Sequence, residues 1–287
     1  MQLQSKEPLL GNSQIQRYQQ AGYLAVEGLI SEEELASARA AIDTAVVQRT
    51  AEDRRSMAEK TRYEQSFVQC MRLWEDHPEV APFTFHPLIA QAAAELMGVD
   101  CARLWQDQAL YKEAGGAATT AHQDQSFWPI GDAPLVSAWV ALTDVTRENG
   151  AMGYVPGSHL AGRLQVVDIT HQSQPYDILQ DTALGVATTE WVEASAGTVI
   201  FHHGYCVHQA GPNQTTETRR AMTMVYYADG TIREKDWPVF GLDRAKIAVG
   251  EPIEGLGLPV AWPREDNALP EAPSQLGAKV GFGFERK

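Results

Sequence analysis

The sequence has few cysteines and no long apolar run. Its 287 residues include three cysteines, Cys70, Cys101 and Cys206, and none of them forms a C-x-x-C pair. An odd number of isolated cysteines argues against a disulfide framework and is typical of free thiols in a reducing compartment. Residues 1–12 are polar and lack the apolar core of a signal peptide, and no segment approaches the length of a membrane span. We therefore expect a cytoplasmic protein.

Basic residues are also scarce. The chain has 23 Lys and Arg against 37 Asp and Glu, which gives a formal net charge of −14. Nucleic-acid and anionic-membrane surfaces need clustered Lys and Arg, so we expect neither partner and predict a small-molecule ligand instead. Because 44% of the residues are hydrophobic, the chain can bury one large core, and we expect residues 1–287 to form one domain. The composition leaves the oligomeric state open.

Helical patterns are concentrated in the N-terminal third of the chain. Ser31 and Glu34 form a capping box in front of apolar residues at helical spacing. Residues 87–97 have Pro in their first turn and Gly98 directly after them, as a second helix would. With a polar helix near residues 13–20 and a short strand at residues 22–26, these patterns predict a mainly helical cover over about 13–98.

Strand patterns follow the helices. Segments rich in β-branched and aromatic residues are separated by Gly, Pro and Asn; they are 103–111, 135–145, 197–201, 206–210 and 220–228. We therefore expect a mainly β chain with helical cover, of the α+β class, whose residues 101–229 form a sheet sandwich or barrel. Residues 249–287 are rich in Pro and Gly without periodicity, which predicts a covering loop or a loosely ordered end.

The most informative motif is His122-Gln123-Asp124. In an extended strand His122 and Asp124 would project to the same side while Gln123 points away. Two histidines and one carboxylate are the ligand set of non-haem Fe(II) oxygenases, and they leave positions on the metal open. The motif is weak on its own, because a histidine in a strand is more often structural than a ligand. His208 is the candidate for the second histidine ligand, with His202 and His203 as rivals.

Two adjacent arginines follow His208. Residues 211–215 have turn composition, so we expect the next strand to return beside His208 and to bring Arg219 alongside it. A guanidinium forms a charge-assisted, bidentate pair with a carboxylate. Strand alternation places Arg219 and Arg220 on opposite faces, so only one of them can face the interior. A surface ion pair would suit Arg220.

In their order and spacing these motifs resemble the phytanoyl-CoA dioxygenase family over about residues 13–229. The resemblance also includes a Trp-containing strand, an Asn-Gly pair and a Pro-Gly-Ser-His turn, at 137–144, 149–150 and 156–159. It implies a double-stranded β-helix, or jelly-roll, core.

The resemblance also implies roles for individual residues. It makes His122, Asp124 and His208 iron ligands and assigns Arg219 to the distal carboxylate of 2-oxoglutarate. The resemblance also places Trp139 and Gln108 beside this cosubstrate, although the family usually has a residue other than glutamine at the position of Gln108.

An enzyme of this kind would use Fe(II), 2-oxoglutarate and O2 to hydroxylate a C–H bond of a small organic molecule, releasing succinate and CO2. Because related halogenases lack the carboxylate ligand, Asp124 favours hydroxylation. The acidic balance argues against a polyanionic CoA ester as substrate. Gln125, Phe127, Trp128 and Tyr111 are the expected pocket wall. Two alternatives are a cupin-like metal oxygenase independent of 2-oxoglutarate and a non-catalytic β-sandwich binding protein with structural histidines.

Overall fold

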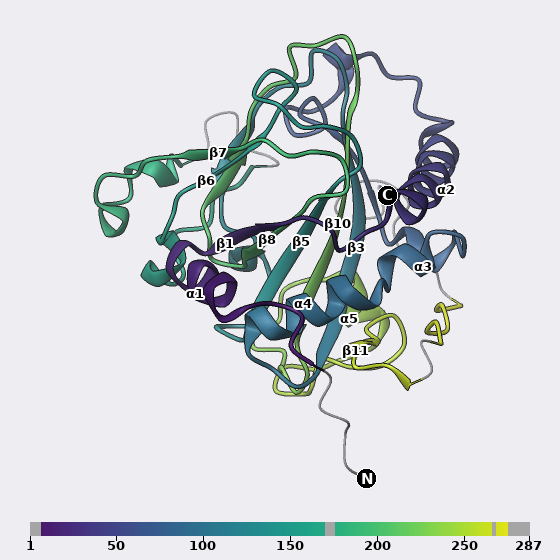
Figure 1. The fold of residues 1–287 in the computed structure, drawn as a ribbon, viewed down its shortest axis with the longest axis vertical. Helices are drawn as coiled ribbons and strands as arrows, with labels where there is room; N and C mark the ends of the chain where they lie inside the picture. The colour runs from purple at the N-terminus through teal and green to yellow at the C-terminus, as the bar shows by residue number, and fades with distance from the viewer. Residues whose placement is uncertain (1–6, 170–175, 266–267, 275–287) are drawn as a thin grey trace.

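Two antiparallel sheets form the centre of the computed structural model, which describes residues 7–169, 176–265 and 268–274 (Figure 1). The major sheet has the order β1-β8-β5-β10-β3-β11, with β2 also paired to β3. Its strands are β1 (Tyr23–Val26), β2 (Val68–Met71), β3 (Ala102–Lys112), β5 (Leu135–Ala141), β8 (Val199–His203), β10 (Arg219–Ala228) and β11 (Val260–Trp262). The minor sheet has the order β4-β9-β6-β7. Its strands are β4 (Thr119–His122), β6 (Met152–Tyr154), β7 (Glu190–Val192) and β9 (His208–Ala210). This is the predicted jelly-roll architecture.

Helices cover the outer face of the major sheet (Figure 1). They are α1 (Asn12–Ala21), α2 (Glu32–Thr50), α3 (Ala81–Thr84) and α4 (Pro87–Met97). α5 (Phe240–Arg244) instead packs through Leu242 in a separate apolar cluster with Trp105 and Val225. The capping box at the start of α2 is confirmed, since Ser31 and Glu34 cap each other's backbone N–H groups. Gly98 ends α4 in the left-handed region, with φ of 68°. Short 3-10 segments lie at Met57–Glu59, Leu73–Glu75, Gln125–Phe127, Ser158–Ala161, Ile178–Gln180 and Thr182–Leu184.

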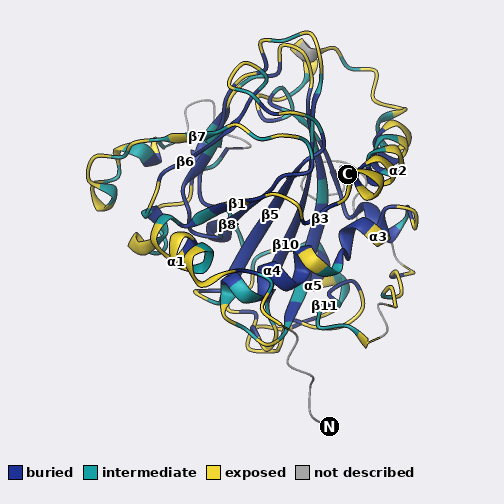
Figure 2. Ribbon diagram, viewed as in Figure 1, coloured by how far each residue is buried: buried dark blue, intermediate teal, exposed yellow. Residues whose placement is uncertain are grey.

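Strand alternation separates a helix-facing surface of the major sheet from a surface that faces the minor sheet. On β10, Met222, Met224 and Tyr226 pack into the apolar core shared with α2 and α4. Arg219 and Thr223, on the other face, line a cavity between the two sheets. Figure 2 shows that the strands of the major sheet are made largely of buried residues. The face toward the minor sheet therefore carries polar side chains that line the cavity, whereas the face toward the helices packs in the apolar core.

Both ends of the chain contribute strands to the major sheet; the short strand expected at residues 22–26 is confirmed as β1, whereas β2 and β11 were not predicted. The segment 13–98, expected to be mainly helical cover, supplies β1 and β2 to the edges of the major sheet. In the C-terminal segment, β11 pairs with β3, so its described part is an ordered covering segment; the expectation for residues 275–287 lies outside the described residues. Within the described ranges, no helix has both the length and the apolar character to cross a bilayer.

Candidate metal centre and cavity

His122 and His208 lie directly opposite each other on β4 and β9. Opposed residues of an antiparallel pair have closely spaced side chains, and the two ring centroids are 4.4 Å apart. Each Nδ1 lies within hydrogen-bonding distance of a backbone carbonyl, that of Thr120 at 2.8 Å and that of Cys206 at 3.0 Å. Since a carbonyl can only accept, each Nδ1 carries the proton and each Nε2 offers a lone pair. Such second contacts are what orient histidine ligands on a metal.

Asp124 reaches the two histidines from a turn. The prediction that His122 and Asp124 lie on one extended strand is wrong, because β4 ends at His122 and Asp124 has helical φ and ψ of −64° and −51°. Its Oδ1 is nevertheless 3.5 Å from Nε2 of His122 and 3.6 Å from Nε2 of His208. One ligand atom from each of the three residues lies within 4.8 Å of the other two. Gln123 does point away, and its amide donates to two backbone carbonyls.

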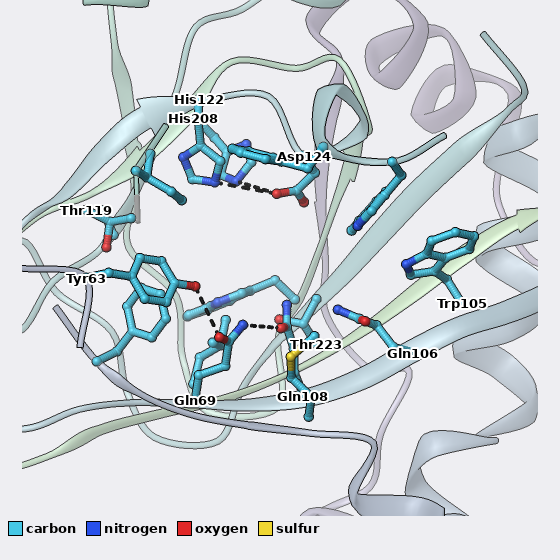
Figure 3. Close-up of a pocket in the computed structure, with 18 of the residues that line it drawn as sticks. Tyr63, Gln69, Trp105, Gln106, Gln108, Thr119, His122, Asp124, His208 and Thr223 are labelled. Carbon is cyan, nitrogen blue, oxygen red and sulfur yellow. Dashed lines mark hydrogen bonds and ion pairs between the residues drawn. The ribbon is translucent and has the colours of Figure 1, made fainter. Parts of the chain in front are cut away.

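The second oxygen of Asp124 is held by the major sheet. Asp124 Oδ2 accepts a hydrogen bond from Ser137 Oγ at 3.0 Å and lies 3.2 Å from His202 Nε2. Figure 3 shows His122, His208 and Asp124 pointing toward one another. His202 therefore contacts the carboxylate of this cluster, whereas His203 lies beside His159, with ring centroids 5.2 Å apart. Of the two rival histidines, only His202 lines the cavity.

The protonation states of the cluster suit a cation. Burial lowers the pKa of His208 to about 3, so its ring is neutral near pH 7. Burial alone would raise the pKa of Asp124, but interactions with His208, His122 and His202 hold it well below its usual value. A neutral imidazole and an ionised carboxylate are the forms that bind a divalent metal.

A cavity of about 420 Å³ lies beside the cluster, and it is lined from both sheets and from loops. This volume is within the range of small-molecule sites. The polar lining residues include Gln69, Gln106, Gln108, Thr119, Thr223, Arg72 and Arg219. The aromatic lining residues are Tyr63, Phe67, Trp105, Phe127, Trp128, Trp139 and Phe240. Figure 3 shows part of this lining, with the His-Asp-His cluster on one wall and the glutamines on the facing wall.

Arg219 and Arg220 separate as strand alternation predicts. Arg219 is 2% exposed and lines the cavity, whereas Arg220 makes an ion pair with Asp43 of α2 at 2.7 Å. The expectation that the strand after His208 returns beside it as a hairpin is wrong, however. β9 belongs to the minor sheet and β10 to the major sheet, so Arg219 faces the cavity from the sheet opposite His208.

Several buried donors on the cavity wall have no hydrogen-bond partner. They include Arg219 Nε, Trp139 Nε1 and the hydroxyls of Thr119 and Thr223. The Arg219 guanidinium lies 5.2 Å from the Trp139 ring centroid, and its Nη1 donates to the Leu110 carbonyl at 3.3 Å. Buried polar atoms are costly to leave unpaired. The wall therefore fits a ligand that brings acceptor oxygens, as a dicarboxylate does.

Gln108 lies in the cavity wall and is held by a chain of side chains. Tyr63 Oη donates to Gln69 Oε1 at 3.2 Å, and Gln69 Nε2 donates to Gln108 Oε1 at 2.6 Å (Figure 3). Sequence reasoning missed Tyr63 and Gln69, which carry no motif and lie far along the chain from the histidines. Arg72, Gln106, Trp105 and Phe240 were missed for the same reason.

The expected pocket wall was half correct. Phe127 and Trp128 line the cavity. Tyr111 instead donates its hydroxyl to Asp43 on the helix-covered face, and the Gln125 amide donates to the carbonyls of residues 131 and 133. Tyr111 lies on the strand face opposite the cavity, so its aromatic character contributes to the core.

The fold and site thus define a jelly-roll protein with a buried His-Asp-His cluster beside a small-molecule cavity. Residues 18–221 match the family model of phytanoyl-CoA dioxygenase (PhyH), and the chain belongs to this family. It is similar to a probable α-ketoglutarate-dependent hypophosphite dioxygenase of Stutzerimonas stutzeri, 29% identical over 142 residues, which are 48% of each protein. It is also similar to a methylphosphonate hydroxylase of Gimesia maris, 26% identical over 79% of this chain and 85% of the relative.

Among solved structures, the epimerase SnoN in complex with Fe3+, α-ketoglutarate and nogalamycin RO is similar to this chain. The two share 26% identity with a TM-score of 0.69, over 87% of this chain and 97% of SnoN. The similar proteins named above thus include iron- and 2-oxoglutarate-dependent oxygenases. The matched region spans about half the length of the hypophosphite dioxygenase.

Proposed function

We propose that this protein is an Fe(II)- and 2-oxoglutarate-dependent dioxygenase that hydroxylates a C–H bond of a small organic molecule. His122, Asp124 and His208 would hold the iron, and Arg219 would bind the distal carboxylate of 2-oxoglutarate. The observation that carries the proposal is the pairing of the His-Asp-His cluster with unpartnered donors on the wall of the same cavity. The cluster alone would suit any metal protein, and the donors alone would suit any anion.

The metal ligands are oriented before the metal binds. The backbone carbonyls behind His122 and His208 fix which nitrogen faces the cluster. Ser137 and His202 hold Asp124 Oδ2, which leaves Oδ1 toward the two imidazoles. When bound, iron and 2-oxoglutarate supply the activation of O2, with release of succinate and CO2. The retained carboxylate ligand, Asp124, supports hydroxylation as the outcome.

The cosubstrate end is built by Arg219, Trp139 and Thr119. Burial lowers the pKa of Arg219 to about 10, so the guanidinium remains charged at neutral pH. A carboxylate placed there would receive a charge-assisted hydrogen bond from Arg219 and a neutral one from the Trp139 N–H. Gln108, whose oxygen is already occupied by Gln69, would offer its amide N–H. Aromatic side chains such as Trp105 and Phe127 would exclude water from the reacting end.

A small molecule is the proposed partner, and the names of the relatives include a hypophosphite dioxygenase and a methylphosphonate hydroxylase. We propose residues 1–287 as a single functional domain. A cytoplasmic location is supported by the three free cysteines, since reducing compartments keep thiols unpaired.

The proposal is tested by oxygen-dependent succinate release from 2-oxoglutarate in the presence of Fe(II), with Asp124→Ala as the inactive variant and Arg220→Met as the matched control. We expect release by the wild-type protein and by Arg220→Met, and none by Asp124→Ala. Oxygen consumption that continues without 2-oxoglutarate would indicate a metal oxygenase of another kind. Absence of both iron binding and release would indicate a binding protein.

A further inference from the structure

A second arginine, Arg72, lines the cavity and is 3% exposed. It follows β2 directly, and its backbone has φ of 54° and ψ of 44°. This left-handed conformation is uncommon for a residue other than glycine, and it persists only where surrounding structure enforces it. Here the backbone N–H of Arg72 is bound to the carbonyl of Asp107 at 2.8 Å. Strained backbone of this kind is concentrated at functional sites.

The Arg72 guanidinium has no adequate partner in the fold. Its Nε and Nη1 are buried without a hydrogen bond. Glu75 is within ion-pair distance, with 3.8 Å between Nε and Oε1. Both oxygens of Glu75 are already hydrogen-bonded to Arg244, at 2.6 and 2.8 Å. One buried carboxylate thus faces two guanidinium groups.

Asp107 does not supply the missing bond. Its Oδ2 accepts from the Thr84 hydroxyl at 2.7 Å and from the Trp74 N–H at 3.1 Å. Its Oδ1 is itself buried without a partner. Burial lowers the pKa of Arg72 to about 10, which leaves the group charged at neutral pH. A charged, buried guanidinium with two N–H groups that lack a hydrogen bond favours an anion from outside the fold.

Arg72 and Arg219 are held in different parts of the cavity. β2 and β10 flank opposite edges of β3. The backbone N–H of Arg72 is bound to the carbonyl of Asp107, and the side-chain Nη1 of Arg219 to the carbonyl of Leu110. These anchor points are about 10 Å apart along β3. The two guanidinium groups lie beside different rings, that of Arg72 beside Phe240 and that of Arg219 beside Trp139. A cosubstrate on Arg219 therefore leaves Arg72 free for a different molecule.

Aromatic rings also lie close to Arg72. Its Cζ lies 5.2 Å from the Phe240 ring centroid. Trp105 and Trp128, with ring centroids 5.4 Å apart, line the same cavity. A ligand bound here would place an anionic group on Arg72 and an apolar body along these rings.

We propose that Arg72 binds an anionic oxygen group of the substrate, a carboxylate or a phosphonate carried on an apolar body. The inference rests on the proposed function, because it assigns Arg219 to the cosubstrate and Arg72 to the substrate. Arg72 is then the residue that selects acidic substrates over neutral molecules of the same shape.

Calorimetric titration of the metal-free protein tests this assignment. The probes are straight-chain alkyl carboxylates and alkylphosphonates, with primary alcohols of equal chain length as neutral controls. The titration is repeated in Arg219→Met, so that anions bound at the cosubstrate end do not contribute. We expect the anions to bind that variant roughly tenfold or more tightly than the alcohols, as a charge-assisted hydrogen bond would give. The tighter class of anion identifies the group.

Arg72→Gln and Arg72→Lys are made in the Arg219→Met protein, because an intact Arg219 would itself bind anions. There Arg72→Gln should lose the preference, and Arg72→Lys should retain part of it. Equal binding of anions and alcohols by Arg219→Met, or an unchanged preference after Arg72→Gln is added to it, would overturn the assignment. If Arg72→Gln does not fold, the preference for anions over alcohols is compared before and after Arg72→Lys is added to Arg219→Met. A reduced preference would support the role of Arg72, and an unchanged one would overturn it. Anaerobic binding of Fe(II) and 2-oxoglutarate to wild type and Arg72→Gln is measured in parallel. Equal cosubstrate binding without an anion preference would refute only the role of Arg72, whereas no cosubstrate binding by the wild type would refute the proposed function.

Discussion

Replacement of Arg219 by Met should weaken 2-oxoglutarate binding and yet stabilise the protein without ligand. Burial lowers the pKa of this guanidinium from 12.5 to about 10, which corresponds to roughly 3 kcal/mol of unfavourable free energy for the charged form. The contact with the Trp139 ring and the hydrogen bond to the Leu110 carbonyl each offset about 1 kcal/mol. The free energy of unfolding should therefore rise by about 1 kcal/mol in Arg219→Met, raising Tm by a few degrees.

Cosubstrate affinity should change in the opposite direction. A charge-assisted hydrogen bond contributes about 1.5–3 kcal/mol, so Arg219→Met should bind 2-oxoglutarate roughly ten- to a hundredfold more weakly. The assay is a 2-oxoglutarate titration of the anaerobic Fe(II) protein, together with thermal denaturation of the metal-free protein.

Arg220→Met is the matched control for both measurements. Its ion pair with Asp43 joins side chains that are 32% and 35% exposed, and such pairs contribute about 0–1 kcal/mol. Arg220→Met should therefore have a slightly lower Tm and unchanged cosubstrate affinity. Equal losses of affinity in the two variants, or no loss in Arg219→Met, would refute the strand-face assignment.

Four further substitutions test other parts of the protein. His202→Ala should still bind Fe(II), because His202 contacts Asp124 Oδ2 and not the cluster of ligand atoms, whereas His208→Ala should lose it; equal metal loss by elemental analysis would contradict this division. Trp139→Phe should weaken 2-oxoglutarate binding about threefold to tenfold without lowering Tm, since the lost N–H has no partner in the fold; a lower Tm with unchanged affinity would show a packing role. Burial raises the pKa of Asp107 from 3.8 to about 6, so the native state holds this proton more tightly than the unfolded state. The stability contributed by the protonated form is thus present below about pH 4 and is lost as pH rises through 6, and Asp107→Asn should gain up to about 3 kcal/mol at pH 7 in denaturant melts. If the free energy of unfolding had the same pH dependence in Asp107→Asn as in the wild type, the prediction for Asp107 would be refuted.

The sequence predicted features that depend on local order. The capping box of α2, the Gly98 end of α4 and the alternation of Arg219 and Arg220 depend on neighbouring residues, so periodicity was sufficient for them. The central strands β3, β5 and β10 were predicted to within a few residues, except that β5 ends at Ala141. The family resemblance placed the histidines in a jelly roll.

Features that depend on sheet pairing could not be predicted. A turn after β9 permits either a hairpin or a crossing between sheets, and the sequence did not show that β10 joins the opposite sheet. The turn at Asp124 replaced an expected strand because the chain bends directly after His122. Arg72 belongs to the cavity only because β2 pairs with β3, a contact between distant segments that no local pattern reports.

Anaerobic titration of the apo-protein with Fe(II) and then 2-oxoglutarate tests the central claim most directly. The visible charge-transfer band of a metal-chelated 2-oxo acid reports the metal cluster and the cosubstrate wall together, before any substrate is known. We predict a saturable band in the wild-type protein and none in Asp124→Ala. Iron that binds without producing the band, or a band of equal strength in Asp124→Ala, would contradict the assignment of this cavity to iron and 2-oxoglutarate.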